Sequence, residues 1–185
     1  MARNMLVLGA YGHVGTWIVP ELVKLDCIGR LVATGRKKAM LDSRLAGIGS
    51  TKLEMQTLDA FDKPALRAAC KGMDFFINCV GPYAWRGSEI AAEVVGQGVN
   101  YVDFANEQSH YHRLLVIGAD AERNGLVLVT GAGTSPGVST ALFQMGKEAV
   151  PAARTFEMFY ASGRHPSRVP RLKQSDWRVA QFIHT

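Results

Sequence analysis

The chain has 185 residues, of which 48% are hydrophobic and 20% are charged, and its mean hydropathy is +0.03. This composition excludes a disordered chain, and the lack of a long apolar run excludes a membrane span. The length favours one full domain. Cys27, Cys70 and Cys79 form no C-x-x-C pair and leave one cysteine over, which disfavours a disulfide scaffold and indicates a reducing cytoplasm. The N-terminus has no cleavage site and is not expected to be a signal peptide.

The formal net charge of +5 is unevenly distributed along the chain. Residues 1–150 contribute +1 and residues 151–185 contribute +4, so the basic excess does not cover the folded body. A basic tail can bind phosphates or anionic lipids, but a solvated or incomplete segment is the simpler interpretation. We therefore expect no nucleic-acid partner and no integral membrane span. A homodimer is possible.

Short apolar runs alternate with segments of helical spacing almost from the first residue. Buried strands are predicted at Met5–Leu8, Arg30–Thr34, Lys52–Met55, Asp74–Asn78, Asn100–Phe104 and Leu126–Val129. Helices are predicted at Val14–Leu25, Ala39–Ala46, Pro64–Cys70, Ser88–Val95, Ser109–Arg123 and Val138–Ala149. This alternation predicts an α/β fold with a Rossmann-type, doubly wound parallel sheet of six strands.

Two features depart from the regular alternation. Pro20 falls inside the first predicted helix and should kink it or shorten its early turns. After Pro151 the composition changes to a β-like stretch, Thr155–Tyr160, followed by a segment rich in proline and arginine. We expect residues 1–150 to form the first domain. Residues 151–185 are too few for a complete second domain, so we expect them to be its partly flexible, β-containing beginning.

A glycine-rich sequence stands between the first predicted strand and the first predicted helix. It reads Gly9-Ala-Tyr-Gly12-His-Val-Gly15, a close variant of the dinucleotide fingerprint. The first glycine allows a tight turn, the second lets the backbone approach a pyrophosphate, and the third lets helix and strand pack closely. The helix N-terminus offers unpaired N–H groups and a positive dipole end to the phosphates. The residues predicted to bind a dinucleotide here are Gly9, Tyr11, Gly12, His13, Val14 and Gly15.

The end of the second predicted strand indicates which dinucleotide binds. An NAD site places Asp or Glu there to accept from the ribose 2′-hydroxyl, but this chain has Gly35-Arg36-Lys37 and no acid until Asp42. A guanidinium and a neighbouring ammonium suit a 2′-phosphate, which predicts NADP rather than NAD, although a solvated basic turn is the alternative. Further on, Asp59 is placed either to accept from the adenine amino group or to cap the next helix.

Other enzyme chemistries find little support in the sequence. No tyrosine is followed four residues later by lysine, which disfavours a short-chain dehydrogenase other than an atypical one. His110 and His112 lack a cluster of Cys or carboxylate ligands and would point apart on a helix. We therefore interpret both as surface residues and predict no metal site. Cys79 is interpreted as a small core residue rather than a nucleophile.

A set of motifs after the fourth predicted strand resembles the saccharopine dehydrogenase-like family. The set comprises Asn78-Cys-Val-Gly-Pro-Tyr83, Gly87, Gly98-Val-Asn-Tyr-Val-Asp103 and Glu107, followed by Gly131-Ala-Gly133 and Ser135-Pro-Gly137. The family has a G-P-Y loop, a G-x-x-Y-V-D strand and a G-E pair in this order, and the resemblance covers residues 4–150. Asn106 departs from the pattern, because the family tends to have glycine before the glutamate. The motif therefore does not predict the backbone conformation of this turn.

The resemblance implies an NAD(P)-dependent oxidoreductase in which a largely β second domain covers the nicotinamide and shapes the substrate pocket. Family members include saccharopine reductases, which make or break a C–N bond through an imine, and trans-acting enoyl reductases, which reduce C=C bonds. The resemblance also implies that Gly81, Pro82 and Tyr83 border the nicotinamide side of the cofactor. Tyr83, Asp103 and Glu107 are the candidate catalytic residues, with a helix N-cap pair as the equal alternative for the two carboxylates.

Two functions of different classes stay open at this point. The chain is either the cofactor-binding part of a cytoplasmic NADP(H)-dependent oxidoreductase that acts on a C=N or C=C bond of a small molecule, or a non-catalytic dinucleotide-binding sensor or regulatory module. The sequence assigns neither the substrate nor the direction of hydride transfer.

Overall fold

The computed structural model of the chain describes residues 2–158, 161–162 and 178–179. The chain divides into two compact units, Met1–Val138 and Ser139–Thr185. The first unit contains the sheet and all of the residues predicted to bind a cofactor.

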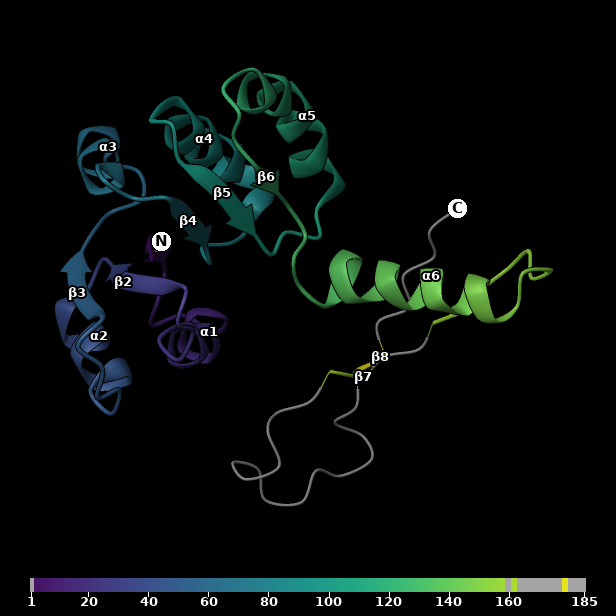
Figure 1. The fold of residues 1–185 in the computed structure, drawn as a ribbon, viewed down its shortest axis with the longest axis horizontal. Coiled ribbons are helices and arrows are strands. Elements are labelled where there is room, and N and C mark those ends of the chain that lie inside the picture. The colour runs from purple at the N-terminus through teal and green to yellow at the C-terminus, as the bar shows by residue number, and fades with distance from the viewer. Residues whose placement is uncertain (1, 159–160, 163–177, 180–185) are drawn as a thin grey trace. The chain divides into compact units, whose positions relative to one another are not determined.

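The first unit is built on a six-stranded sheet in which all neighbouring strands are parallel (Figure 1). Its strands are β1 (Arg3–Leu8), β2 (Ile28–Gly35), β3 (Leu53–Thr57), β4 (Phe75–Asn78), β5 (Asn100–Asp103) and β6 (Leu128–Val129). Their order is β3-β2-β1-β4-β5-β6, which reverses between β1 and β4. Sheets of this kind bind ligands beyond the carboxyl ends of the strands at such a switch point. The predicted Rossmann-type sheet is therefore confirmed.

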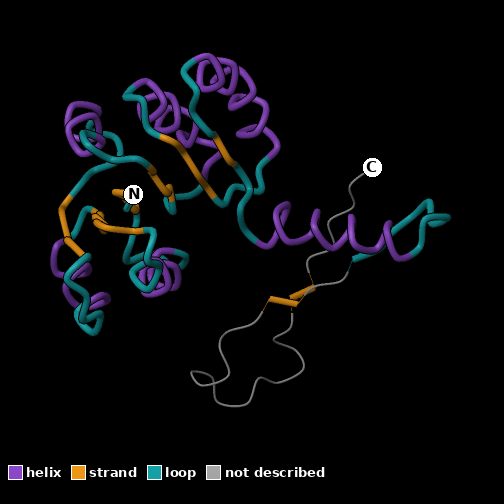
Figure 2. The backbone as a smooth tube through the Cα atoms, in the orientation of Figure 1, coloured by secondary structure: helices purple, strands orange, loops and turns teal. Residues whose placement is uncertain are grey.

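Helices connect the strands and cover both faces of the sheet (Figure 2). They are α1 (Gly15–Leu22), α2 (Lys38–Leu45), α3 (Lys63–Cys70), α4 (Tyr83–Gly96) and α5 (Gln108–Arg123). Leu6 and Leu8 of β1 belong to the core beneath α3, α4 and α5, whereas Val7 belongs to the core beneath α1 and α2. Because successive side chains of a strand point to opposite faces, a strand buried on both faces has to be apolar throughout.

Two helices differ from the predicted bounds by more than one residue at an end. Helix α1 begins at Gly15, continues through Pro20 and ends at Leu22 rather than Leu25, so the difference falls at its C-terminal end and not in the early turns. Helix α4 begins at Tyr83, five residues before the predicted start at Ser88. Its early start depends on a hydrogen bond from the Tyr83 backbone N–H to a carboxylate far along the chain, which local spacing does not reveal.

The second unit contains helix α6 (Ser139–Ala149) and the short strands β7 (Ala161–Ser162) and β8 (Arg178–Val179), which pair antiparallel. An irregular turn at Thr134–Val138 precedes α6. Within the unit, the rings of Phe143 and Phe156 lie 6.0 Å apart, edge to face. The β-like stretch expected at residues 155–160 is not a strand over residues 155–158, and residues 159–160 lie outside the described part. The domain boundary expected near residue 150 stays a prediction.

Candidate dinucleotide-binding site

Three glycines shape the loop between β1 and α1. Gly9 has a φ of +78°, a left-handed conformation that favours glycine, and it turns the chain out of β1. A Cβ at Gly15 would lie 2.4 Å from the Gly9 carbonyl oxygen and 2.6 Å from Cα of Ala10, so only glycine lets α1 begin this close to the strand. A Cβ at Gly12 would lie 3.0 Å from the same carbonyl oxygen. The loop therefore has the tight turn and the close packing that a pyrophosphate cradle needs.

The start of α1 presents unpaired backbone donors. In the part of the chain that the structure describes, the N–H groups of His13, Val14 and Gly15 donate no hydrogen bond. The turn itself is held by the Gly12 N–H, which donates to the Gly9 carbonyl at 2.9 Å, and by the Thr16 hydroxyl, which donates to the Gly12 carbonyl at 2.9 Å. The positive end of the helix dipole lies at the same point, so this loop suits a phosphate anion.

Two basic side chains follow β2 at the same edge of the sheet. Arg36 and Lys37 are exposed, and among the described residues neither forms an ion pair. The next residue, Lys38, is instead paired with Asp42 at 2.8 Å. The Arg36 guanidinium and the Lys37 ammonium are thus available to an anionic ligand. Tyr11 lies beside them, with its ring packed against Gly35.

Asp59 does not cap the helix that follows it. One of its carboxylate oxygens accepts from the Phe61 backbone N–H at 3.0 Å within a local turn. The N-cap of α3 is Asp62, whose side chain accepts from the Ala65 backbone N–H at 3.0 Å. The capping alternative for Asp59 is therefore wrong, because a second aspartate stands closer to the first turn. Its contact with adenine stays a prediction.

The G-P-Y loop, Gly81–Tyr83, leads from β4 into α4. The buried Tyr83 hydroxyl donates to the carbonyl of Asn78 at 2.8 Å. Burial raises the pKa of this hydroxyl well above its usual range, so it stays protonated at neutral pH. The Tyr83 side chain is thus held within the fold by its hydroxyl.

Glu107 joins the G-P-Y loop to the loop after β5. Its carboxylate accepts from the Tyr83 backbone N–H at 2.9 Å and from the Asn106 backbone N–H at 3.0 Å. Glu107 is the N-cap residue of α5, but its side chain makes no cap bond to that helix. The alternative in which its side chain caps the following helix is therefore wrong, since that side chain caps α4 instead. Asn106 has a negative φ, so the turn does not need the glycine that the family tends to have there.

Asp103 ends β5 in a fully buried position and accepts four hydrogen bonds. One oxygen accepts from the Ala105 and Gly131 backbone N–H groups, each at 3.1 Å, and from the Thr130 hydroxyl at 2.6 Å. The other oxygen accepts from Nε2 of His110 at 2.7 Å. Burial raises the pKa of Asp103, but these donors outweigh it and hold the pKa below its ordinary value. Asp103 is therefore an ionised carboxylate within the fold and caps no helix.

His110 is not the surface residue that the sequence analysis expects. Its side chain is fully buried between α4 and α5, with its ring centroid 5.5 Å from that of Tyr83. His112 is exposed, so the two histidines do point apart. The H-x-H spacing alone does not show which of the two histidines is buried. Only the hydrogen bond to Asp103 identifies His110 as the buried one. Nδ1 of His110 has no hydrogen-bond partner among the described residues, which is an uncommon arrangement for a buried nitrogen.

Cys79 follows β4 and packs against the core beneath α1 and α2. Burial raises the pKa of its thiol to about 12, so the nucleophilic thiolate is not formed at neutral pH. Cys79 is partly buried and packs as a small residue against this core.

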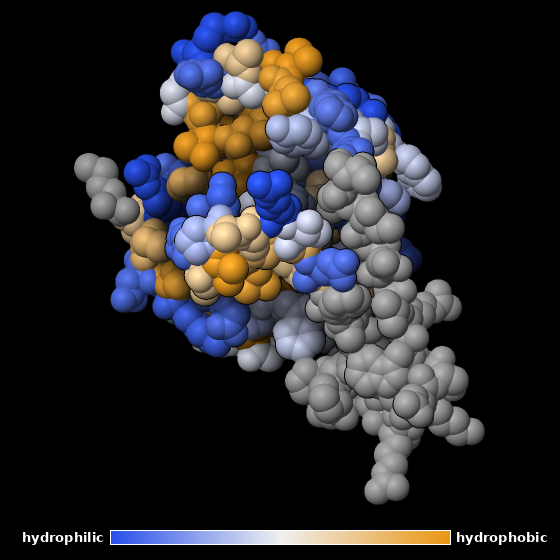
Figure 3. All heavy atoms as spheres, turned by 90° about the vertical axis from the view of Figure 1, so that its right-hand side faces the viewer, coloured by the Kyte–Doolittle hydropathy of each residue, from blue (hydrophilic) through white to orange (hydrophobic). Residues whose placement is uncertain are grey.

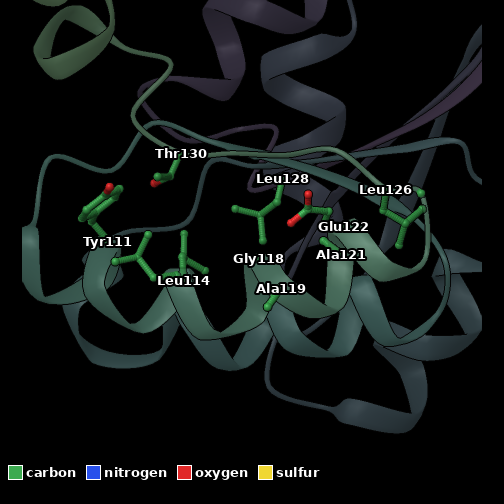
Figure 4. Close-up of a pocket in the computed structure, with 11 residues that line it drawn as sticks. Tyr111, Leu114, Gly118, Ala119, Ala121, Glu122, Leu126, Leu128 and Thr130 are labelled. Atoms are coloured by element: carbon green, nitrogen blue, oxygen red, sulfur yellow. The ribbon is translucent and has the colours of Figure 1, made fainter.

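A groove of about 680 Å³ lies between α5 and β6. Figure 4 shows Tyr111, Leu114 and Glu122 of α5 along one side of it, with Thr130, Leu128 and Leu126 along the other. Figure 3 shows the side of the molecule that lies at the right in Figure 1, and apolar residues gather in the upper part of this face. Helix α5 lies at the same height in Figure 1. No residue of the glycine loop or of the basic turn after β2 lines this groove, so it is not the candidate cofactor site.

The described residues contain no helix that is long and apolar enough to cross a membrane. No group of three or more His, Cys, Asp or Glu side chains among them could hold a metal ion.

The sheet order, the glycine loop and the open start of α1 define a dinucleotide-binding domain of the Rossmann type. Residues 5–129 match the family model of the saccharopine dehydrogenase NADP binding domain. Because this match spans more than half of the chain, the chain belongs to the saccharopine dehydrogenase-like family, as its motifs indicate. It therefore carries the dinucleotide-binding domain of that family, whose cofactor is a nicotinamide dinucleotide.

Individual proteins are similar to this chain in sequence or in fold. The chain is 26% identical over 142 residues to the "probable mitochondrial saccharopine dehydrogenase-like oxidoreductase" of Arabidopsis thaliana, covering 70% of this chain and 31% of the relative. Its fold is similar to that of apo saccharopine dehydrogenase (L-Glu forming) from Saccharomyces cerevisiae, with a TM-score of 0.69, 19% identity, and coverage of 86% of this chain and 34% of that chain. A Rossmann-fold NAD(P)-binding family protein from Shigella flexneri is similar with a TM-score of 0.50, 17% identity, and coverage of 70% and 66%.

The chain spans about a third of the length of the Arabidopsis and yeast relatives. The activity of a whole enzyme is therefore not transferred to it by similarity alone. The expected cytoplasmic location stays a prediction.

Proposed function

We propose that this chain is the NADP(H)-binding part of an oxidoreductase that transfers a hydride to or from a C=N or C=C bond of a small molecule. The observation that carries the proposal is the combination of a pyrophosphate cradle with a basic turn at one edge of the sheet. Gly15 is closely packed at the start of α1, and Arg36 and Lys37 stand unpaired after β2. Membership of the saccharopine dehydrogenase-like family supports the same proposed function.

Each part of the proposed site has a distinct role toward the cofactor. The loop Gly9–Gly15 and the first N–H groups of α1 bind the pyrophosphate. Arg36 and Lys37 bind the 2′-phosphate, with Tyr11 beside them, and Asp59 faces the adenine. Gly81, Pro82 and Tyr83 border the nicotinamide. The nicotinamide supplies the hydride chemistry, while these residues bind and orient the dinucleotide.

A non-catalytic dinucleotide-binding module is the alternative function, and one observation favours it. The three candidate catalytic side chains, Tyr83, Asp103 and Glu107, already make hydrogen bonds to neighbouring groups of the fold. Tyr83 and Asp103 are buried, and both carboxylate oxygens of Glu107 accept from backbone N–H groups, so none of the three is presented to a substrate. Within the described residues, we therefore assign none of the three as the catalytic acid or base.

The test is a titration of the 185-residue chain with NADPH, NADH and their oxidised forms, followed by cofactor fluorescence or calorimetry. We expect NADPH to bind more tightly than NADH. Gly12→Val should abolish binding, because a Cβ there already meets the Gly9 carbonyl and would crowd the pyrophosphate. Gly49→Val is the matched control, since a Cβ at Gly49 meets nothing within 4 Å. A folded Gly12→Val variant with unchanged affinity would show that the loop is only a structural turn.

A further inference from the structure

We propose that His110 and Asp103 are positioning residues for the nicotinamide half of a bound dinucleotide, a role that rests on the proposed function. Neither side chain is exposed, so neither can touch a ligand. They would act by fixing the G-P-Y loop against the neighbouring loops at the carboxyl ends of the strands.

The topology separates the two halves of the ligand. The strands β1, β2 and β3 form one half of the sheet, which carries the glycine loop and Arg36. The strands β4, β5 and β6 form the other half, which carries the G-P-Y loop and Asp103. A dinucleotide that binds across the switch point places its two nucleotides over different halves. If the 2′-phosphate lies near Arg36, the nicotinamide lies over β4, β5 and β6.

Asp103 joins the ends of β5 and β6. It closes the turn after β5 through the Ala105 N–H, and it holds the start of the loop after β6 through the Gly131 N–H and the Thr130 hydroxyl. A second bond reinforces this junction, since the Ala132 N–H donates to the Asp103 backbone carbonyl at 2.9 Å. A single carboxylate thus sets the relative position of two loops.

His110 extends the junction to α4 and to the G-P-Y loop. Its Nε2 lies 2.7 Å from Asp103, and its ring packs against Tyr83, whose hydroxyl is held by the Asn78 carbonyl at the end of β4. The ring fits only because residue 87 is glycine, since a Cβ at Gly87 would lie 2.8 Å from Cε1 of His110. The loops after β4, β5 and β6 are therefore joined by one buried chain of contacts.

This arrangement predicts an effect on one half of the ligand only. Loosening the chain of contacts should displace the G-P-Y loop and weaken contacts with the nicotinamide nucleotide. The glycine loop and Arg36 belong to the other half of the sheet and should be unaffected. The expected signature is a loss of affinity for the whole dinucleotide without a loss of affinity for its adenine half, adenosine 2′,5′-bisphosphate.

The experiment compares the dissociation constants of these two ligands in the full 185-residue chain. His110→Leu removes the Nε2 donor and should weaken NADPH about tenfold or more, while adenosine 2′,5′-bisphosphate changes by less than about twofold. His110→Gln keeps an N–H donor near the position of Nε2 and should restore most of the NADPH affinity. His112→Leu, at an exposed position on the same helix, is the control and should change neither constant.

A second variant keeps the test decisive if His110→Leu does not fold. Thr130→Val is nearly isosteric and removes the hydroxyl that donates to Asp103, and it should also weaken NADPH selectively. Equal weakening of both ligands, or unchanged NADPH affinity in folded His110→Leu or Thr130→Val protein, overturns the positioning role alone. If wild-type protein binds neither ligand, the proposed dinucleotide function fails and the positioning role fails with it.

Discussion

The ring of Tyr11 lies directly on Gly35, so closely that a Cβ built at Gly35 would be 2.3 Å from Cε1 and 2.7 Å from Cδ1 of the ring. Gly35 is the last residue of β2, next to the basic turn. It therefore occupies the place at which an NAD site carries its acid, and here that place is filled by an aromatic ring from the glycine loop.

Gly35→Asp alone should not convert the protein to NADH binding, although the sequence by itself suggests this exchange. The new side chain has to displace Tyr11, so we expect weaker binding of both NADPH and NADH. The double variant Tyr11→Ala/Gly35→Asp should recover NADH binding, because the carboxylate can then reach the ribose 2′-hydroxyl. Dissociation constants from cofactor fluorescence check this, with Tyr11→Ala as the control. A clean switch to NADH in Gly35→Asp alone would show that Tyr11 does not restrict the site.

Arg36→Ala should weaken NADPH by roughly ten- to more than hundredfold and leave NADH nearly unchanged, because only NADPH has a phosphate for the guanidinium. The contact is exposed, so the preference for NADPH should shrink as the salt concentration rises. Arg44→Ala, at an exposed arginine of α2, is the matched control. Binding of NADH as tight as that of NADPH to wild-type protein at low salt would contradict the assignment of NADP.

Alanine should have opposite effects at two glycines of α4. At Gly87 the new methyl would lie 2.8 Å from Cε1 of His110 and 3.0 Å from Cβ of Tyr83, so Gly87→Ala should destabilise the fold by about 1–3 kcal/mol. At Gly96 the methyl meets nothing within 4 Å, so Gly96→Ala should raise stability by up to about 1 kcal/mol. Urea unfolding measures both. A Gly87→Ala variant as stable as wild type would mean that His110 can move without cost.

Acid should reveal the buried carboxylate of Asp103. Its pKa in the folded state lies below the ordinary value of about 4, so it contributes stability above that pH. This contribution is lost as the pH falls through the folded-state pKa. Asp103→Asn should lose about 1.5–3 kcal/mol of unfolding free energy at pH 7, because Nε2 of His110 and the other donors lose their charged acceptor.

The pH dependence of Asp103→Asn provides the check. Its unfolding free energy should fall less steeply between pH 5 and about pH 2 than that of wild type. Other carboxylates with a lowered pKa, such as Glu93 beside Arg67, are present in both proteins and cancel in the difference. Parallel pH profiles would show that Asp103 is not ionised in the folded state.

The sequence by itself determined the sheet, the order of its elements and the glycine loop. Apolar runs such as that of β1 have to be buried on both faces, and a strand–glycine–helix sequence has few alternative conformations. Motif order also identified the family before the fold was known. These features can be predicted from the sequence because each depends on residues that lie close together along the chain.

Only the tertiary structure decided the roles of the polar residues. His110 is internal because Asp103, seven residues away, is buried beside it, and Glu107 serves α4 because Tyr83 N–H lies within 2.9 Å of it. A polar side chain can face water or a buried partner with the same local sequence. The choice is made by which loops meet at the carboxyl edge of the sheet, and this is a property of the folded chain rather than of any segment.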